Sequence, residues 1–147
     1  MSYRLILDDL RTAQQCTVSN GKFNYVPLLQ LTETKPEDWV IVRNYDQFVQ
    51  VINERGIPDF ISFDHDLDRS AMREYFFAIE NGKPFNYNNV KEKTGLDCAK
   101  FLIDKCKESV RILPEITLHT ANTLGWENIN AELEAYRKFQ AFHTSQQ

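Results

Sequence analysis

Short apolar runs and longer amphipathic stretches alternate along this chain. The apolar runs are typical of buried strands, and β-branched residues dominate the run at 39–43. We predict strands of one sheet at residues 4–7, 39–43, 58–63 and 116–119. Acidic or polar residues directly follow the first, third and fourth of these runs.

The amphipathic stretches repeat their apolar residues at helical spacing. Their apolar faces are Phe48, Val49 and Ile52; Met72, Tyr75, Phe76 and Ile79; Leu96, Ala99, Leu102, Ile103 and Cys106; and Trp126, Ile129, Leu133 and Tyr136. Residues that favour helix ends are Asp46 and Gly56 around the first helix, Thr94 or Gly95 before the third, and Asn122 or Thr123 before the last. Four helices are therefore expected.

The stretch 11–36 is less regular than the rest of the chain. Residues 19–22 read Ser-Asn-Gly-Lys, which is a turn signal. They predict a small hairpin between 16–18 and 23–26. The apolar residues of 28–31 fit a short strand or a loop.

Alternation of strands and helices predicts an α/β fold, in which right-handed crossovers build a mainly parallel sheet covered on both faces. We expect an open three-layer domain over 1–147, with its four core strands in the order 2-1-3-4. Residues 68–93 form an insertion after the third strand, and 143–147 form a frayed tail.

Composition narrows the function classes. Hydrophobic residues make up 42% of the chain and aromatic residues 12%, which is typical of a globular protein. The net charge of −4 gives no overall basic field for duplex DNA. No apolar run approaches the length of a membrane span, and the chain starts without a leader pattern.

The cysteines suggest a reducing compartment. Cys98 and Cys106 lie on a helical apolar pattern, where a free thiol packs as a small hydrophobic group. Cys16 stands alone in a polar stretch, and no CxxC spacing occurs. We therefore expect a cytoplasmic protein without disulfide bonds.

Acidic residues after the first and third strands are the main candidates for chemistry. Asp8 and Asp9 follow one strand, and Asp64 and Asp66 follow the other. The carboxyl ends of parallel strands are where open α/β folds hold ligands. Carboxylates brought together there repel one another unless a proton or a cation intervenes. The pattern predicts an oxygen-rich site for Mg²⁺ or Mn²⁺.

Further polar residues at the same strand ends suit a phosphate. His65 and His119 are candidates for general acid–base work or for structural roles. Arg11 could pair with the acids or bind phosphate. Thr120 and Asn122 could hydrogen-bond phosphoryl oxygens, and Asn122 could instead cap the last helix. These predictions share one edge of the sheet.

Four segments together resemble a known family. They are Leu-Asp-Asp-x-Arg at 7–11, Ser-Phe-Asp-His-Asp-Leu at 62–67, Thr-Gly-x-Asp-Cys-Ala at 94–99, and His-Thr-Ala-Asn at 119–122 with Asn-Ile at 128–129. Three of them resemble the strand ends of response-regulator receiver domains. All four in this order are similar to the receiver-derived family called the cyclic-phosphate processing receiver domain.

The resemblance implies a receiver-like (flavodoxin-like) fold and a role for each strand end. By the receiver match, Asp8, Asp9 and Asp64 hold Mg²⁺, Asp64 is the phosphoacceptor position, and Thr120 supplies the hydroxyl. Receivers also have a fifth strand that carries an essential lysine. Residues 130–147 contain neither a convincing strand nor a Lys-Pro pair, so the lysine-coupled switch of receivers is not expected.

Two classes of function follow. The first is a metal-dependent phosphoesterase or phosphotransferase that acts on cyclic phosphates, such as 2′,3′-cyclic phosphate ends of RNA. Its catalytic candidates are Asp64, His65 and His119. The second is a degenerate receiver that binds a protein partner, either phosphorylated on Asp64 or inactive. Neither class requires duplex DNA or a membrane.

Overall fold

The structure is a computed structural model that describes residues 2–19, 24–109 and 111–145. Its strands are β1 (Arg4–Leu7), β2 (Thr17–Ser19), β3 (Tyr25–Pro27), β4 (Trp39–Val42), β5 (Phe60–Phe63) and β6 (Glu115–Leu118). Its α-helices are α1 (Leu28–Thr32), α2 (Tyr45–Arg55), α3 (Arg69–Asn81), α4 (Gly95–Glu108) and α5 (Thr123–Ser145). Short 3₁₀ turns are η1 (Ala13–Gln15), η2 (Pro36–Asp38) and η3 (Tyr87–Asn89).

The main sheet has four parallel strands in the order β4-β1-β5-β6. This is the predicted order 2-1-3-4, and the receiver-like α/β prediction is confirmed. Leu7 pairs with Val42 and Phe63, and Phe63 pairs with Leu118, so the strands end at the same level. Within the described residues no fifth strand extends the sheet beyond β6.

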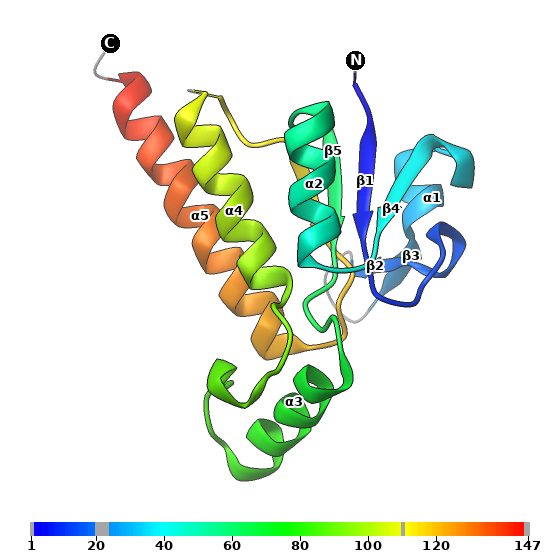
Figure 1. The fold of residues 1–147 in the computed structure, drawn as a ribbon, viewed down its shortest axis with the longest axis vertical. Helices are drawn as coiled ribbons and strands as arrows, with labels where there is room; N and C mark the ends of the chain where they lie inside the picture. The colour runs from blue at the N-terminus through cyan, green and yellow to red at the C-terminus, as the bar shows by residue number, and fades with distance from the viewer. Residues whose placement is uncertain (1, 20–23, 110, 146–147) are drawn as a thin grey trace.

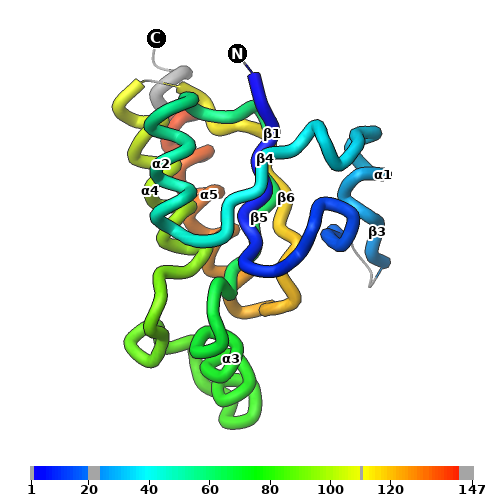
Figure 2. The backbone as a smooth tube through the Cα atoms, turned by 45° about the vertical axis from the view of Figure 1, so that its right-hand side comes forward, coloured from blue at the N-terminus to red at the C-terminus, as the bar shows by residue number. Residues whose placement is uncertain are grey.

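The two faces of the sheet are covered unequally (Figures 1 and 2). Leu5 and Leu7 of β1 point to one face, where α2, α4 and α5 pack against them. Ile6 points to the other face and packs among Cys16, Leu28 and Trp39. Alternation along a buried strand directs successive side chains to opposite layers. The three free cysteines are buried, so the prediction of Cys98 and Cys106 as core residues is confirmed.

The irregular segment before β4 forms the thinner layer. Residues 17–19 pair with 25–27 as an antiparallel hairpin, as predicted, while its turn at 20–23 lies outside the described residues. The prediction of a strand or loop at 28–31 was wrong, because these residues form α1. Its buried residue Leu28 packs on the sheet, and tertiary packing decides the structure of so short an apolar run.

Capping residues account for most helix limits. Asn44, not the predicted Asp46, caps α2, and its Oδ1 accepts a hydrogen bond from Gln47 N at 2.8 Å. Thr94 begins α4 with a capping box, as predicted, and the predicted inward face of α4 is buried. The last helix continues to Ser145, and fraying of the tail from residue 143 stays a prediction.

Helix α3 lies beyond the carboxyl ends of the strands and does not cover the sheet (Figure 1). The sequence indicated an apolar face on this helix, yet Met72, Phe76 and Ile79 are about half exposed. Its buried positions are Ala71, Glu74 and Ala78. No described helix is both long and apolar enough to cross a membrane.

Candidate active site

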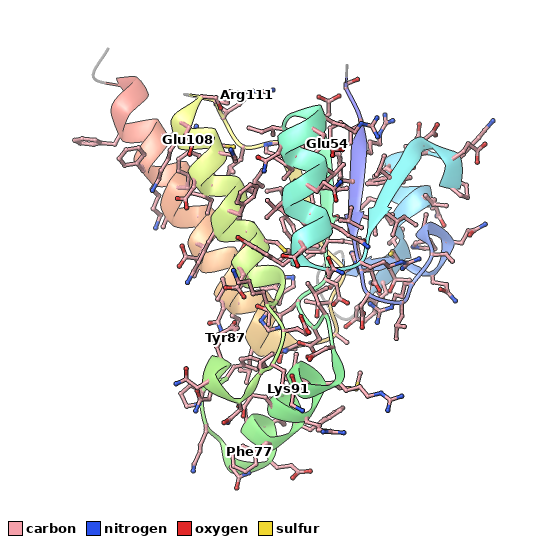
Figure 3. The ribbon with its side chains drawn as sticks, in the orientation of Figure 1. Glu54, Phe77, Tyr87, Lys91, Glu108 and Arg111 are labelled. Atoms are coloured by element: carbon pink, nitrogen blue, oxygen red, sulfur yellow. The ribbon has the colours of Figure 1, made fainter. Side chains whose placement is uncertain are left out.

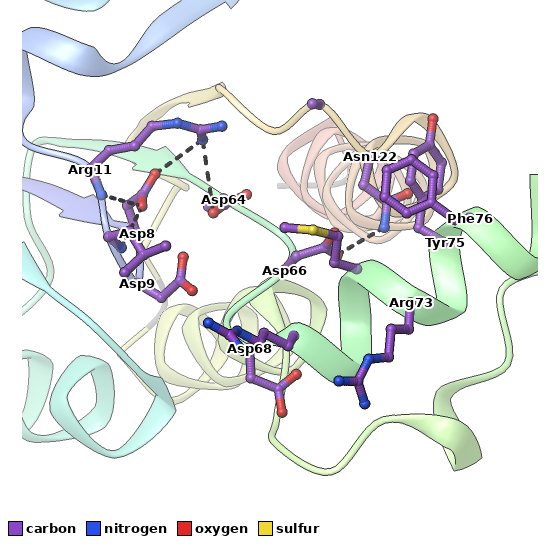
Figure 4. Close-up of a pocket in the computed structure, with 14 residues that line it drawn as sticks. Asp8, Asp9, Arg11, Asp64, Asp66, Asp68, Arg73, Tyr75, Phe76 and Asn122 are labelled. Atoms are coloured by element: carbon purple, nitrogen blue, oxygen red, sulfur yellow. Dashed lines mark hydrogen bonds and ion pairs between the residues drawn. The ribbon is translucent and has the colours of Figure 1, made fainter.

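Three carboxylates meet where β1 and β5 end. Asp8 and Asp9 follow β1, and Asp64 follows β5. One oxygen from each lies within 4.8 Å of the others. Asp8 and Asp64 are buried, and Asp9 is half-buried. Figure 4 shows the three side chains converging beside Arg11. The predicted convergence of these strand ends is therefore present in the structure.

Asp8 is held from several directions. Its Oδ1 accepts hydrogen bonds from the backbone N–H groups of Leu10 and Arg11 at 2.9 and 2.7 Å. Its Oδ2 accepts from His119 Nε2 at 2.9 Å. Burial alone would raise the pKa of Asp8, but these bonds hold the pKa well below its usual range. Asp8 is therefore a fixed anion.

The pKa of Asp64 is shifted in the opposite direction to that of Asp8. Burial, and then the charge of Asp8, raise the pKa of Asp64 to about 8. Burial and the charge of Asp8 also raise the pKa of Asp9. Like charges this close resist simultaneous ionisation. The cluster therefore favours a bound proton or a bound cation.

Arg11 is the cation nearest to these acids. Its Nη1 lies 3.2 Å from Asp8 Oδ2 and 3.9 Å from Asp64 Oδ2. Burial lowers the pKa of Arg11, but the charges of Asp8 and Asp64 outweigh that effect and raise it. The guanidinium is partly exposed, so it can also contact a ligand.

His119 lies behind Asp8. Because a carboxylate only accepts hydrogen bonds, Nε2–H donates to Asp8 Oδ2, and Nδ1 accepts from Ser62 Oγ at 2.7 Å. Thr117 Oγ1 donates to Ser62 Oγ at 3.0 Å. Burial lowers the pKa of His119 despite the opposing effect of Asp8. The contacts support a positioning role, and proton transfer by His119 stays a prediction.

His65 lies behind Asp66 in a similar way. Its Nδ1–H donates to Asp66 Oδ1 at 2.7 Å, and Tyr87 Oη donates to Nε2 at 2.9 Å. Asn128 Nδ2 donates in turn to Tyr87 Oη at 3.0 Å. His65 is fully buried, so its contacts support a role in orienting Asp66. Acid–base catalysis by His65 stays a prediction.

The segment after β6 contributes Asn122 to the site. Asn122 Oδ1 accepts from Gly125 N at 2.8 Å, so it caps α5. Its Nδ2 donates to Asp66 Oδ1 at 2.8 Å. Thr120 Oγ1 accepts from Asn122 N at 3.1 Å, and Thr120 does not line the cavity beside the acids. The structure thus gives no support for the predicted phosphate contact by Thr120.

A cavity of about 460 Å³ opens at this edge of the sheet. Asp8, Asp9, Asp64 and Arg11 line one end, and α3 with its capping residue Asp68 lines the other (Figure 4). Its lining residues are Asp8, Asp9, Leu10, Arg11, Asp64, Asp66, Asp68, Arg69, Met72, Arg73, Tyr75, Phe76, Ala121 and Asn122. Neither His65 nor His119 is among them.

The donor set fits a hard divalent cation. Asp8, Asp9 and Asp64 offer only oxygen, which Mg²⁺ and Mn²⁺ prefer. Burial and the charge of Asp8 raise the pKa of Asp64 even though Arg11 is close, so a bound cation would favour its ionised form. Asp66 was predicted as a ligand, but the three acids group without it. An ion sharing Asp8 Oδ2 would compete with Arg11.

Comparison with known protein families identifies the family of this chain. A family model described as the cyclic-phosphate processing receiver domain matches residues 3–135. The chain belongs to this family. Comparisons with curated proteins and with solved structures gave no match. The match spans β1 to the middle of α5, so it includes every residue of the cavity.

In this chain the cation beside the acids is an arginine. No lysine lines the cavity in the described part of the chain, and Arg11 occupies the position next to Asp8 and Asp64. The absence of a fifth strand among the described residues agrees with this difference. In the described residues the acidic strand ends are thus paired with an arginine and with no lysine of the cavity.

Several residues of the site were not found from the sequence. Tyr87 lies in a stretch that resembled a polar loop, yet its hydroxyl contacts His65. Ser62 and Thr117 are ordinary strand residues whose contacts with His119 and with each other depend on strand pairing. The spacing of apolar residues in the sequence indicated an apolar face on α3. It did not indicate that this face lines a cavity and does not pack in the core.

Gly125 provides a test of the packing around His65. A Cβ at this position would overlap the imidazole of His65. We expect Gly125→Ala to lower the free energy of unfolding by about 1–3 kcal/mol, the usual cost of overpacking. Urea unfolding measures this. Gly82→Ala is not a suitable control because Gly82 has positive φ, so Glu127→Ala, which places an alanine at an exposed position of the same helix, serves instead. Equal stability of Gly125→Ala and wild type would contradict this packing.

Proposed function

We propose that the protein is a metal-dependent phosphoesterase or phosphotransferase that opens cyclic phosphates, with 2′,3′-cyclic phosphate ends of RNA as its substrate. The observation that carries the proposal is the carboxylate group Asp8, Asp9 and Asp64 at the mouth of a cavity. The family supplies the cyclic-phosphate class. RNA ends are a narrower choice that the experiments below test.

The three acids are proposed to hold Mg²⁺ or Mn²⁺. Such an ion would neutralise phosphate charge and polarise the phosphorus–oxygen bonds. Arg11 is placed to donate to a non-bridging phosphate oxygen because its guanidinium is partly exposed beside the acids. The fixed anion Asp8 keeps Arg11 oriented through two hydrogen bonds. Arg11 donates one from its backbone N–H to Asp8 Oδ1 and one from Nη1 to Asp8 Oδ2.

Asp66 is proposed as the proton acceptor for an attacking water. His65 and Asn122 both donate to its Oδ1, and the carboxylate lines the cavity. Water attack on phosphorus forms one P–O bond and breaks the bond to one ribose oxygen. Asp66 takes one proton of the water and passes it to the departing ribose oxygen, and a phosphate monoester results. Asp64 as a transient nucleophile is a second route, through an acyl phosphate.

A receiver-type switch has less support than hydrolysis. The hydroxyl position, Thr120, lies outside the cavity lining, and no lysine lines the cavity among the described residues. Phosphorylation of Asp64 by acetyl phosphate, without turnover of any cyclic phosphate, would favour that alternative.

Turnover of a 2′,3′-cyclic mononucleotide tests the proposal. ³¹P NMR distinguishes the cyclic diester from the monoester product. We expect conversion with Mg²⁺ or Mn²⁺, and none in excess EDTA or with Asp64→Asn. Asp59→Asn is the matched control, because it makes the same change at an exposed residue before the start of β5. Absence of turnover of both the mononucleotide and an RNA oligonucleotide that ends in a 2′,3′-cyclic phosphate, or equal turnover by Asp64→Asn, would overturn the proposal.

A further inference from the structure

The cavity is larger than a cyclic phosphate requires. Its volume of about 460 Å³ lies in the range of sites that hold ligands of nucleotide size. Asp8, Asp9, Asp64 and Arg11 occupy one end, and Asp68 lies at the start of α3 (Figure 4). Helix α3 forms the opposite wall, and the proposed phosphate chemistry assigns nothing to it.

This wall presents large apolar side chains that the core does not use. Met72 is 49% exposed and Phe76 is 56% exposed, and both line the cavity. The same helix turns the small residues Ala71 and Ala78 inward instead. An exposed aromatic ring is a stacking surface for a nucleobase, which is how single-stranded nucleic acid is commonly bound.

The wall also carries two arginines that form no ion pair among the described residues, although Asp66 and Asp68 line the same cavity. Arg69 and Arg73 line the cavity. Neither forms an ion pair with the acids in the described part of the chain, whereas Arg11 pairs with Asp8. Guanidinium groups bind phosphate in a bidentate manner. Two of them remain for an anion other than the reacting phosphate.

We propose that the α3 wall binds a single-stranded oligonucleotide. Met72 and Phe76 contact the base of the terminal nucleotide, and Arg69 and Arg73 bind the phosphodiester that precedes it. The inference rests on the proposed function and makes its substrate an RNA strand instead of a free cyclic mononucleotide. Such a ligand would contact both kinds of side chain on this wall. Its base would lie beside an aromatic ring, and its second phosphate would lie beside two arginines.

The turnover test compares two substrates. A tetranucleotide that ends in a 2′,3′-cyclic phosphate is expected to exceed the cyclic mononucleotide in kcat/KM by about tenfold or more. In Arg69→Gln/Arg73→Gln this ratio should fall to within about threefold of one. Arg4→Gln/Lys100→Gln is the matched control, because it removes two exposed charges outside the cavity and should keep the wild-type ratio.

Binding provides a readout that does not depend on catalysis. The probe is a fluorescein-labelled tetranucleotide with a 3′-phosphate, measured by anisotropy in EDTA. Phe76→Ala and the double arginine variant should each weaken binding by about fivefold or more. Phe77→Ala is the control for Phe76, because Phe77 is equally apolar and lies at the outer end of α3 outside this cavity (Figure 3).

The outcomes separate this inference from the proposed function. Turnover of the mononucleotide without preference for the tetranucleotide would overturn the inference and leave the proposed function standing. A double arginine variant that binds the probe as wild type does would overturn it as well. Probe binding that depends on Arg69, Arg73 and Phe76, with no turnover of either substrate, would support the subsite and overturn the catalytic proposal.

Discussion

Replacing Asp64 with asparagine is expected to stabilise the metal-free protein while it abolishes turnover. The pKa of Asp64 is raised to about 8 because the carboxyl is buried and lies beside the charge of Asp8. Near pH 8 the variant should unfold with a free energy about 2–4 kcal/mol higher than wild type. Its kcat should fall by about 10³-fold or more, since the site loses one of three shared carboxylates.

The stability difference between Asp64→Asn and wild type is expected to depend on pH. The folded state keeps the proton on Asp64 up to about pH 8, whereas the unfolded chain releases it near the ordinary aspartate pKa of 3.8. Wild-type stability from this group is therefore present at low pH and is lost as the pH rises through that window. Urea unfolding in EDTA should show the advantage of Asp64→Asn growing from about pH 4 to about pH 8. A constant difference, or a less stable variant, would contradict the assignment.

Replacing Asp8 with asparagine is expected to destabilise the protein. Asp8 accepts hydrogen bonds from two backbone N–H groups, from His119 and from Arg11. An amide in its place would direct N–H groups at two donors and leave a buried imidazole poorly paired. The expected loss at neutral pH is about 3 kcal/mol in the free energy of unfolding. Chemical unfolding in EDTA measures it.

Asp9→Asn is the matched control for Asp8→Asn. Both changes remove one negative charge from the same cluster, but the pKa of Asp9 is raised and that of Asp8 is lowered. The pKa of Asp8 below its usual range contributes stability above about pH 4 that is lost on acidification. We expect Asp9→Asn to be neutral or stabilising in EDTA. Equal destabilisation by both variants would contradict the view that hydrogen bonds fix Asp8.

The strand order and the acid cluster could be predicted because they depend on local patterns. Apolar runs followed at once by Asp8 or Asp64 place carboxyl groups at strand ends, and parallel pairing brings those ends to one edge. The start of α4 was equally local, since Thr94 and Asp97 form a capping box within one turn. These features follow from local patterns together with the general rules for pairing parallel strands.

The surroundings of the acids could not be predicted in the same way. The contact between His119 and Asp8 joins residues at the ends of two strands that are not neighbours in the sheet. The contact between His65 and Tyr87 depends on how the insertion folds back after α3. Helical spacing on α3 identified an apolar face correctly, but spacing cannot tell a face that meets the core from one that lines a cavity.

Anomalous diffraction from crystals soaked in Mn²⁺ tests the central claim most directly. The account predicts one peak bounded by oxygens of Asp8, Asp9 and Asp64, at the distances of about 2.0–2.3 Å typical of such ions. The same soak of Asp64→Asn crystals should show a weak peak or none. A strong wild-type peak elsewhere, or no peak at these acids at saturating Mn²⁺, would contradict a shared metal and the catalysis built on it.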